Sequence, residues 1–306
     1  MMAASPPIAT PPRYSIIVTC KGRLEHLLRS LPLFLAQRNA EVVVVDYSCP
    51  DHTASVLAQL HPQARVVAVE AAAQFNLSHA RNLGAAAATG ELLIFLDADV
   101  IIAPDFTERL DGLVAETDGC FHRFQSASAH KLGIAGSCVV ARKHFEAVQG
   151  YDEALQGYGG EDADFYFRLG MVPLRSALLA EDLVAEVLQH DDASRVRFYR
   201  RQSIPEGGLI NAAYRHIKNM LLKQQGVTEL DSSIRRRLYG NVEQTMLTAL
   251  QRSETTIRFD IELLDDPSIR PFSAWRFSRR IAVELNARQP AEDHRGPGPM
   301  RPLGPG

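Results

Sequence analysis

Residues 92–100, LLIFLDADV, join an apolar run to two carboxylates. An apolar run of this length is typical of a buried strand in a parallel sheet. A strand that stops here delivers Asp97 and Asp99 to the carboxyl edge of the sheet, where open α/β folds bind their ligands. If the backbone stays extended, both side chains point to one side, so we expect them to converge on one partner. Hard oxygen ligands suit a Mg²⁺ or Mn²⁺ ion that carries a phosphate.

The composition indicates an ordinary globular protein. The chain has 306 residues, of which 46% are hydrophobic and 23% charged, and its formal net charge is −3. This length supports one large domain or two modest ones. The charge gives no reason to expect a nucleic acid partner, and we interpret the local cluster of Arg195, Arg197, Arg200 and Arg201 as a solvated helix face.

The cysteines and the apolar runs bear on the cellular location. Cys20, Cys49, Cys120 and Cys138 lack the spacing of metal ligands, so we expect free thiols in a reducing compartment. No apolar run approaches the length of a membrane span, and the first residues do not have the pattern of a signal peptide. The sequence therefore predicts a cytoplasmic protein without a membrane span.

Strand and helix patterns alternate in the first half of the chain. The strands are expected at residues 15–19, 41–45, 65–69 and 92–97, and the helices at 23–37, 53–60 and 78–88. Because these strands are apolar on both faces, they predict an α/β fold with a parallel sheet covered by helices. No glycine-rich phosphate loop follows the first strand, which counts against P-loop and dinucleotide-binding proteins.

The second half is predicted to be mostly helical. Short strands at 136–141 and 184–188 and a short helix at 142–148 precede helices from about residue 206, at 232–250 and at 273–287, the last with the single tryptophan, Trp275. Residues 1–12 and 289–306 are rich in Pro with Ala or Gly, so we expect both ends to be disordered.

Three further sites carry candidate chemistry. Asp46 ends the second strand, where a carboxylate can accept hydrogen bonds from a ribose hydroxyl or a base N–H. Asp51, a few residues later, is expected to cap the next helix instead. His190 follows the last strand and becomes a candidate metal ligand if the fold brings it close to Asp99.

The segment 157–164, GYGGEDAD, is the third of these sites. Three glycines in four residues let the backbone approach a ligand closely. The acids fall in the first turn of a helix that we expect to reach Leu169, and compensation of the helix dipole accounts comfortably for one of them. It does not account for the glycines together with three acids, so we favour a functional site.

Taken in chain order, these motifs resemble family 2 glycosyltransferases with a GT-A fold. The stretches that carry the resemblance are SIIVTCKGR, VVVVDYSCPDHT, SHARNLGAAAATGELLIFLDADV, GSCVVARKHFEAVQGYDEAL and GYGGEDADFYFRL, within residues 14–192. The GYGGED stretch also resembles inverting galactosyl- and N-acetylgalactosaminyltransferases and bacterial polysaccharide polymerases. In those families a histidine some thirty residues after GGED completes the metal site, which fits His190.

The resemblance implies a fold and an activity. Residues 13–192 would form a GT-A domain, a mostly parallel sheet flanked by helices. Residues 193–288 lie outside the resemblance, and their apolar periodicity predicts a helical C-terminal appendage. The expected activity is that of an inverting, metal-dependent glycosyltransferase. It would move a sugar from a nucleotide-sugar donor, with UDP as the expected nucleotide, to a hydroxyl of a saccharide, a lipid-linked carrier or another acceptor.

The resemblance also implies roles for individual residues. Five would contact the nucleotide or its diphosphate: Thr19, Arg23, Asp46, Arg81 and Asp97.

Two pairs would carry the metal and the chemistry. Asp99 and His190 would bind Mn²⁺ or Mg²⁺, and the mixed oxygen and nitrogen ligands favour Mn²⁺. Asp162 would be the general base, and Glu161 would orient the acceptor hydroxyls.

The sequence departs from the family pattern at two places. Tyr47-Ser48-Cys49 stands where the family often has Asp-Gly-Ser, and Tyr158 stands where relatives commonly have Trp. The first departure affects base recognition and the second affects the choice of donor or acceptor. Two alternatives stay open: a retaining transferase of the same fold, in which Asp162 is not a base, and an inactive GT-A module that binds nucleotide.

Overall fold

The computed structural model describes residues 11–116, 119–124, 134–263 and 279–286. The chain divides into two compact units, residues 1–239 and 240–306, which are described separately. The domain boundaries predicted from the sequence, including the one after residue 192, stay predictions.

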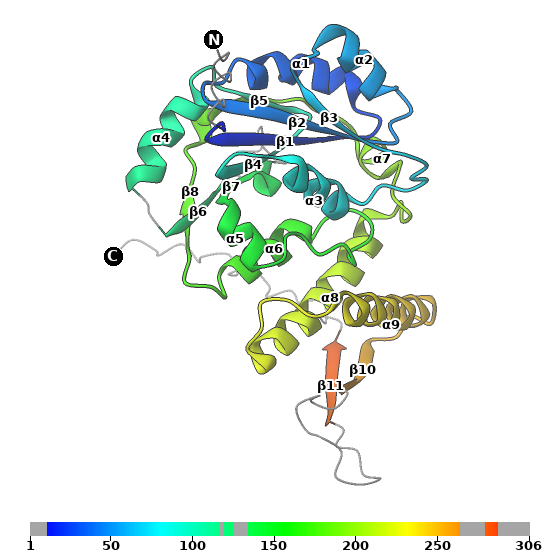
Figure 1. The fold of residues 1–306 in the computed structure, drawn as a ribbon. Coiled ribbons are helices and arrows are strands. Elements are labelled where there is room, and N and C mark those ends of the chain that lie inside the picture. Colours follow the sequence, from blue (N-terminus) through cyan, green and yellow to red (C-terminus); the bar gives the residue numbers. More distant parts are fainter. Residues whose placement is uncertain (1–10, 117–118, 125–133, 264–278, 287–306) are drawn as a thin grey trace, which may run out of the picture. The chain divides into compact units, whose positions relative to one another are not determined.

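A seven-stranded sheet forms the centre of the first unit, in the order β3-β2-β1-β4-β7-β6-β8 (Figure 1). Its parallel part comprises β1 (Tyr14–Cys20), β2 (Ala40–Tyr47), β3 (Arg65–Val69) and β4 (Leu92–Asp97). The remaining strands are β7 (Cys138–Ala141), antiparallel to both β4 and β6 (Cys120–Arg123), and β8 (Arg175–Leu178), parallel to β6. The predicted α/β fold with a mostly parallel sheet is confirmed, although β6 and β8 were not expected. A separate antiparallel pair joins β5 (Val100–Ile102) to β9 (Val184–Val187).

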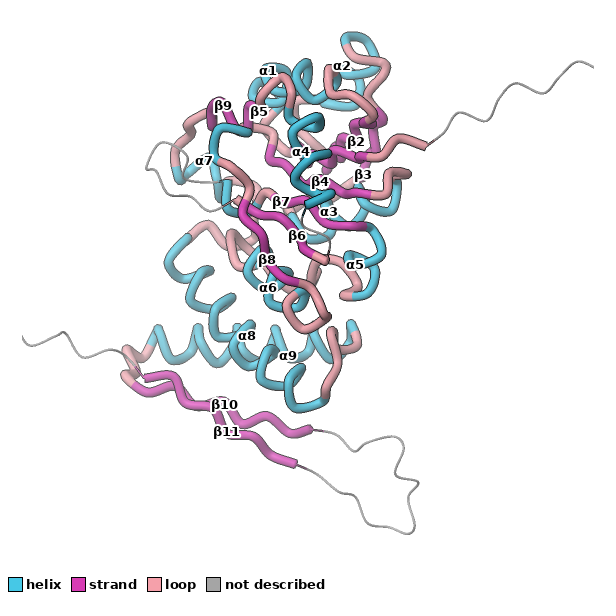
Figure 2. Tube along the Cα trace, turned by 90° about the vertical axis from the view of Figure 1, so that its left-hand side faces the viewer, coloured by secondary structure: helices cyan, strands magenta, loops and turns pink. Residues whose placement is uncertain are grey.

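Helices cover both faces of the sheet (Figures 1 and 2). One face carries α1 (Leu24–Leu35), α2 (Thr53–Leu60) and α4 (Phe106–Glu116). The other carries α3 (Leu77–Ala87), α5 (Arg142–Ala147) and α6 (Glu161–Leu169). The chain continues through α7 (Asp192–Val196), α8 (Ile204–Gln225) and α9 (Ser232–Gln251), with short 3-10 turns at η2 (Ile134–Gly136) and η3 (Glu181–Leu183).

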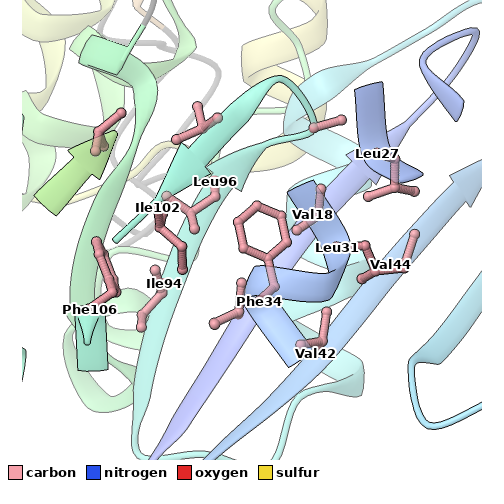
Figure 3. Packing of buried hydrophobic residues seen from close by; sticks show 14 of the residues in the cluster. Val18, Leu27, Leu31, Phe34, Val42, Val44, Ile94, Leu96, Ile102 and Phe106 are labelled. Carbon is pink, nitrogen blue, oxygen red and sulfur yellow. The ribbon is translucent and has the colours of Figure 1, made fainter. Parts of the chain in front are cut away.

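The core explains why the strands are apolar throughout. Alternate residues of a strand point to opposite faces, so Val18 and Val44 pack against Phe34 of α1 (Figure 3), while Ile17 and Val43 belong to the cluster on the opposite face. All five side chains are fully or almost fully buried. Each such side chain stabilises the fold by about 1.5–3 kcal/mol relative to exposure.

The strand order places a crevice beside the central strand. The chain runs from β1 outward through β2 and β3, and then β4 returns to pair with the other side of β1. In open α/β sheets, such a reversal leaves a crevice at the carboxyl ends of the two strands, where ligands bind. Thr19 of β1 and Asp97 of β4 are register partners at this point.

The end of the chain differs from the prediction. Helices α8 and α9 confirm the helical runs expected from residue 206 and at 232–250. Of the helix expected at 273–287, however, residues 279–286 form β11 (Arg279–Asn286), which pairs antiparallel with β10 (Thr256–Leu263). Ile281, Val283 and Leu285 recur every second residue, which is a strand period. Residues 273–278, with Trp275, lie outside the described residues. None of the helices in the described ranges is long and apolar enough to cross a membrane.

A neutral cluster of charged side chains joins α6 to α8. Its cations are Arg168, Lys218 and Arg235, and its acids are Asp152, Asp164 and Glu229. Every member except Arg235 has a side chain with no exposed area. A buried charge is tolerated only when it is paired, so these six side chains depend on one another.

Lys218 lies at the centre of this cluster. Its Nζ is 2.6 Å from Asp152, 3.0 Å from Asp164 and 2.9 Å from Glu229. Burial alone would raise the pKa of Asp152, but Lys218 and Arg235 outweigh it and hold that pKa below its usual value. The three carboxylates are close enough to share a metal ion, and the lysine ammonium takes the position that a cation would fill. Asp164, one of the acids of the GYGGEDAD segment, therefore has a structural role: it pairs with the buried cations of this cluster.

We expect Lys218→Met to destabilise the protein by about 3–5 kcal/mol, because it leaves three buried carboxylates with only two cations. Urea denaturation measures this loss. Lys223→Met, which removes an exposed charge from the same helix, is the control and should change stability by less than about 1 kcal/mol. Equal effects of the two substitutions would contradict a central role for Lys218.

Candidate active site

A pocket opens at the carboxyl ends of β1 and β4. Five of the residues predicted from the sequence line it, namely Thr19, Arg23, Asp97, Asp99 and His190. They come from the end of β1, the turn after β4 and the segment after β9, so the fold brings together residues far apart in the chain. The crevice expected from the strand order therefore contains five of the nine predicted residues, whereas Asp46, Arg81, Glu161 and Asp162 do not line it.

Asp99 and His190 meet directly in this pocket. His190 Nε2 lies 2.7 Å from Asp99 Oδ2, although 91 positions separate the two residues in the chain. The pairing of β5 with β9 makes this contact possible, because Asp99 immediately precedes β5 and His190 follows β9. The backbone bond from Leu188 N–H to the Asp99 carbonyl, 2.8 Å long, extends that pairing to the site.

Two arginines face the other nitrogen of the His190 ring. Arg23 Nη2 lies 3.2 Å and Arg195 Nε 3.4 Å from His190 Nδ1. Guanidinium groups only donate hydrogen bonds, so Nδ1 accepts and Nε2 carries the proton that is donated to Asp99. Burial lowers the pKa of Arg23, and the neighbouring Arg195 lowers it further, whereas Asp99 opposes both effects.

The position of Arg195 corrects the sequence interpretation. We expected Arg195 to lie on a solvated helix face, but its side chain is one-quarter exposed and lines the pocket. Arg201, from the same local cluster, is also largely buried and pairs with Glu206 at 3.2 Å. The sequence signal for Arg195 was its place five residues after His190, on the short helix α7.

Asp97 and Asp99 do not converge on one partner in this structure. The extended backbone ends at Asp97, and Ala98 and Asp99 form a turn before β5 begins. Asp97 therefore accepts a hydrogen bond from Arg81 at 3.0 Å, whereas Asp99 is paired with His190. Burial raises the pKa of Asp97 in spite of Arg81, and the nearby Asp99 raises it further.

Arg81 links the two acidic parts of the site. One guanidinium nitrogen contacts Asp97, and the other lies 3.5 Å from Glu161 at the start of α6. The Arg81 side chain is only 2% exposed and lies over the ring of Tyr151, 5.1 Å from its centroid. Arg81 does not line the pocket. It therefore contacts Asp97 and Glu161 from the interior of the protein and holds both carboxylates in place.

Glu161 and Asp162 occupy the first turn of α6, as the sequence predicted. The Asp162 carboxylate accepts a hydrogen bond from the Ala163 N–H at 2.7 Å, which fixes it against the helix. Burial, reinforced by the adjacent Asp162, raises the pKa of Glu161 to about 7, although Arg81 opposes this shift. Glu161 therefore changes its charge near neutral pH.

Both carboxylate oxygens of Asp46 accept hydrogen bonds from backbone N–H groups. Its Oδ1 accepts from the Cys49 N–H and its Oδ2 from the Ala54 N–H, both at 2.7 Å, and Asp46 does not line the pocket. Asp46 thus accepts a hydrogen bond from an N–H group at the start of α2, the capping role expected of Asp51. His52 occupies the N-cap position and makes no side-chain hydrogen bond to the helix. A nucleotide contact of Asp46 would have to use its remaining lone pairs, and that role stays a prediction.

Aromatic side chains form one wall of the pocket. Tyr158, from the GYGGED stretch, lies 6.3 Å from Tyr199, and Tyr199 lies 5.3 Å from Phe75, measured between ring centroids. All three line the pocket. Flat apolar faces of this kind can stack on a base or a sugar ring. Tyr158 was expected here, whereas Phe75 and Tyr199 were missed because neither belongs to a recognised motif.

The chemistry of Asp99 and His190 fits a divalent metal. Two ligand atoms that share an ion at right angles, each about 2.1 Å from it, are about 3 Å apart. The observed 2.7 Å between His190 Nε2 and Asp99 Oδ2 is close to this separation, and a metal bound to both atoms would replace the proton that Nε2 donates in this structure. A carboxylate with an imidazole suits Mn²⁺ better than Mg²⁺, because Mg²⁺ prefers oxygen ligands alone.

Two family models match the chain in succession. Residues 15–124 match glycosyl transferase family 2, and residues 121–178 match the N-terminal domain of galactosyltransferase. The first range contains the strand that ends in Asp97, and the second contains the GYGGED stretch. The two matched regions are similar to glycosyltransferase domains, the first of them to family 2.

Two curated proteins are similar to parts of the chain. The O-antigen biosynthesis protein RfbC of Myxococcus xanthus is 26% identical over 259 residues, which cover 68% of this chain and 20% of that protein. An uncharacterized glycosyltransferase of Nostoc is 34% identical over 102 residues, which cover 32% of this chain and 31% of that protein. The chain thus spans only about a fifth to a third of the length of these relatives.

Solved structures share the fold at low sequence identity. The mannosyltransferase PcManGT of Pyrobaculum calidifontis, in complex with GDP-Man and Mn²⁺, has a TM-score of 0.50 at 17% identity, with 79% of this chain and 76% of that one covered. TarS of S. aureus, in complex with UDP-GlcNAc, has a TM-score of 0.55 at 14% identity, with 79% and 74% covered. The chain has an α/β fold of the GT-A type.

The raised pKa of Glu161 predicts a pH-dependent stability. Glu161 holds its proton up to about pH 7 in the folded protein, but its ordinary pKa is 4.5, so the folded state loses stability as the pH rises through this window. We expect Glu161→Gln to have a higher melting temperature than the wild type at about pH 8, and we expect this difference in melting temperature to vanish at about pH 4.

Thermal melts across this range measure the effect. Glu146→Gln, which removes an exposed carboxyl group from α5, is the control and should track the wild type at every pH. A constant difference between Glu161→Gln and the wild type would show that Glu161 does not titrate in this window.

Proposed function

We propose that the chain is an inverting, metal-dependent glycosyltransferase that moves a sugar from a UDP-sugar to an acceptor hydroxyl. The observation that carries this proposal is the contact between Asp99 and His190 at 2.7 Å in the pocket at the carboxyl ends of β1 and β4. The family matches and the GT-A fold support the transferase class.

The charges of the pocket support a diphosphate ligand. Arg23 and Arg195 both reach His190 Nδ1, so two guanidinium groups lie near one another beside the aromatic wall. Guanidinium groups bind phosphate oxygens well, because their fixed N–H fork matches that geometry. The solved neighbours hold GDP-Man and UDP-GlcNAc, which are nucleotide sugars of this kind. Thr19 and Asp97 would contact the nucleotide or its ribose from the same pocket.

Asp99 and His190 would hold the metal. When bound, Mn²⁺ would act as a Lewis acid that neutralises the negative charge of the departing nucleoside diphosphate. Arg23 and Arg195 would add positive charge on the same side. Arg81 would keep Asp97 oriented at the edge of this site, because their contact is 3.0 Å long and Arg81 is almost fully buried.

Asp162 would act as the general base. The acceptor oxygen attacks the anomeric carbon from the face opposite the diphosphate, its proton passes to the Asp162 carboxylate, and the bond from the anomeric carbon to the diphosphate oxygen breaks. One displacement of this kind inverts the anomeric centre. The fixed position of the Asp162 carboxylate on the first turn of α6 supports this role, and Glu161 beside it would orient the acceptor hydroxyls.

We expect Asp162→Asn to lower kcat by about 10²–10⁴-fold, because the amide cannot accept the proton. Binding of UDP with Mn²⁺, measured by calorimetry, should change by less than about twofold, since Asp162 would contact the acceptor. The anomeric configuration of the product, read by NMR, tests inversion. Full activity of Asp162→Asn, or a retained configuration, would contradict the proposal.

Substitution of either proposed metal ligand should weaken Mn²⁺ binding. We expect Asp99→Asn and His190→Gln each to lower the affinity for Mn²⁺ at least about tenfold, as followed by electron paramagnetic resonance of the free ion. Asp105→Asn, which alters an exposed carboxylate before α4, is the matched control. If all three variants bind Mn²⁺ like the wild type, the metal site lies elsewhere.

A further inference from the structure

We propose that Asn211, in α8, is the positioning residue that sets the orientation of the turn carrying Glu161 and Asp162. This inference rests on the proposed function, because it assumes that the first turn of α6 carries the chemistry. It also gives a role to a part of the chain to which the sequence assigned none.

The turn before α6 needs an outside support. Gly157, Gly159 and Gly160 all have positive φ angles, of +82°, +85° and +99°. Glycine reaches these conformations at little cost but also leaves them easily, since no side chain restricts its backbone. Gly160 is the N-cap residue of α6 and provides no side-chain hydrogen bond to the helix.

Asn211 supplies that support. Its side-chain amide donates to the Gly159 carbonyl at 2.7 Å, and the Asn211 side chain is buried. The Tyr239 hydroxyl lies 2.9 Å from Asn211 Oδ1 and 3.1 Å from the Gln156 carbonyl. Because the Gly159 carbonyl only accepts hydrogen bonds, the amide faces the turn with its N–H group. A Cβ on Gly160 would come within 3.4 Å of the Asn211 Cβ, which shows how closely α8 packs against the turn.

The same helix holds α6 at a second point. Lys218 follows Asn211 by seven residues, or about two helical turns, so both side chains lie on one face of α8. Asn211 holds the Gly159 carbonyl just before α6, and Lys218 holds Asp164 within its first turn. Glu161 and Asp162 lie between these two points of attachment. The ion pair anchors the helix, and the amide bond sets the angle at which the helix begins.

Loss of the amide bond should therefore act on the chemistry more than on donor binding. A displacement of about 1 Å in a catalytic group can lower the rate about 10²-fold. Tyr158 is the pocket residue that this turn carries, whereas Asp99, His190 and the two arginines come from other segments, so the affinity for nucleotide should change much less than kcat.

The test compares Asn211→Ala with Asn219→Ala, a matched loss of an asparagine from the same helix. Asn219 has a buried Oδ1 without a hydrogen-bond partner among the described residues. Hydrogen exchange of the amides of residues 157–164, followed by mass spectrometry, reports the turn directly. We expect Asn211→Ala to speed this exchange and to lower kcat about 10–100-fold, with the KM for donor within about twofold. Asn219→Ala should do neither.

Tyr239→Phe keeps the shape of the core and removes the hydroxyl that contacts Asn211 Oδ1 and the Gln156 carbonyl just before the turn. It should change exchange and kcat in the same direction but less, and it keeps the test valid if Asn211→Ala fails to fold. Unchanged exchange in residues 157–164 of a folded Asn211→Ala, or faster exchange with wild-type kcat, would overturn the inference. If the wild type transfers no sugar, the proposed function fails, while the exchange measurement still decides whether Asn211 holds the turn.

Discussion

The ammonium group of Lys218 among three buried carboxylates is the interaction on which the arrangement of the site depends. Asp152, Asp164 and Glu229 could not stay charged in the core without it and the two neighbouring arginines. Because Asp164 belongs to α6 and Lys218 to α8, the charge balance also fixes one helix against the other. Helix α6 in turn packs on the sheet through Phe165 and Leu169. The first turn of α6 is thereby held at a defined place relative to the strands.

The site combines two parts of the chain with different tasks. The carboxyl ends of β1 and β4 supply a polar pocket with Asp99, His190 and two arginines. The turn before α6 supplies Glu161 and Asp162. Arg81 contacts both parts, and its almost complete burial means that each contact counts for more than a surface ion pair would. The charged side chains of the site are therefore held in position by ion pairs and hydrogen bonds with one another.

Much of the fold could be predicted because burial on both faces of a sheet leaves a strong signal. The stretches within β1 to β4 are mostly apolar without alternation, and the family resemblance implied that Asp99 and His190 belong to one site. The rest depends on local chain geometry that residue type does not reveal. The turn at Ala98 separates the two aspartates, and left-handed conformations at Ser48 and His52 direct Asp46, not Asp51, to the N–H groups at the start of α2. Arg195 was misplaced because Tyr158, which it contacts, lies 37 positions away in the chain, and β11 was misassigned because its alternation is short.

The guanidinium of Arg81, shared between Asp97 and Glu161, has a thermodynamic consequence. A cation shared by two anions cannot hold both at full strength, so whatever competes for Asp97 releases Arg81 toward Glu161. This coupling is reciprocal: neutralisation of Glu161 strengthens the interaction between Arg81 and Asp97, and the coupling free energy is the same in both directions. The two sides of the site are thus coupled to each other through a single side chain.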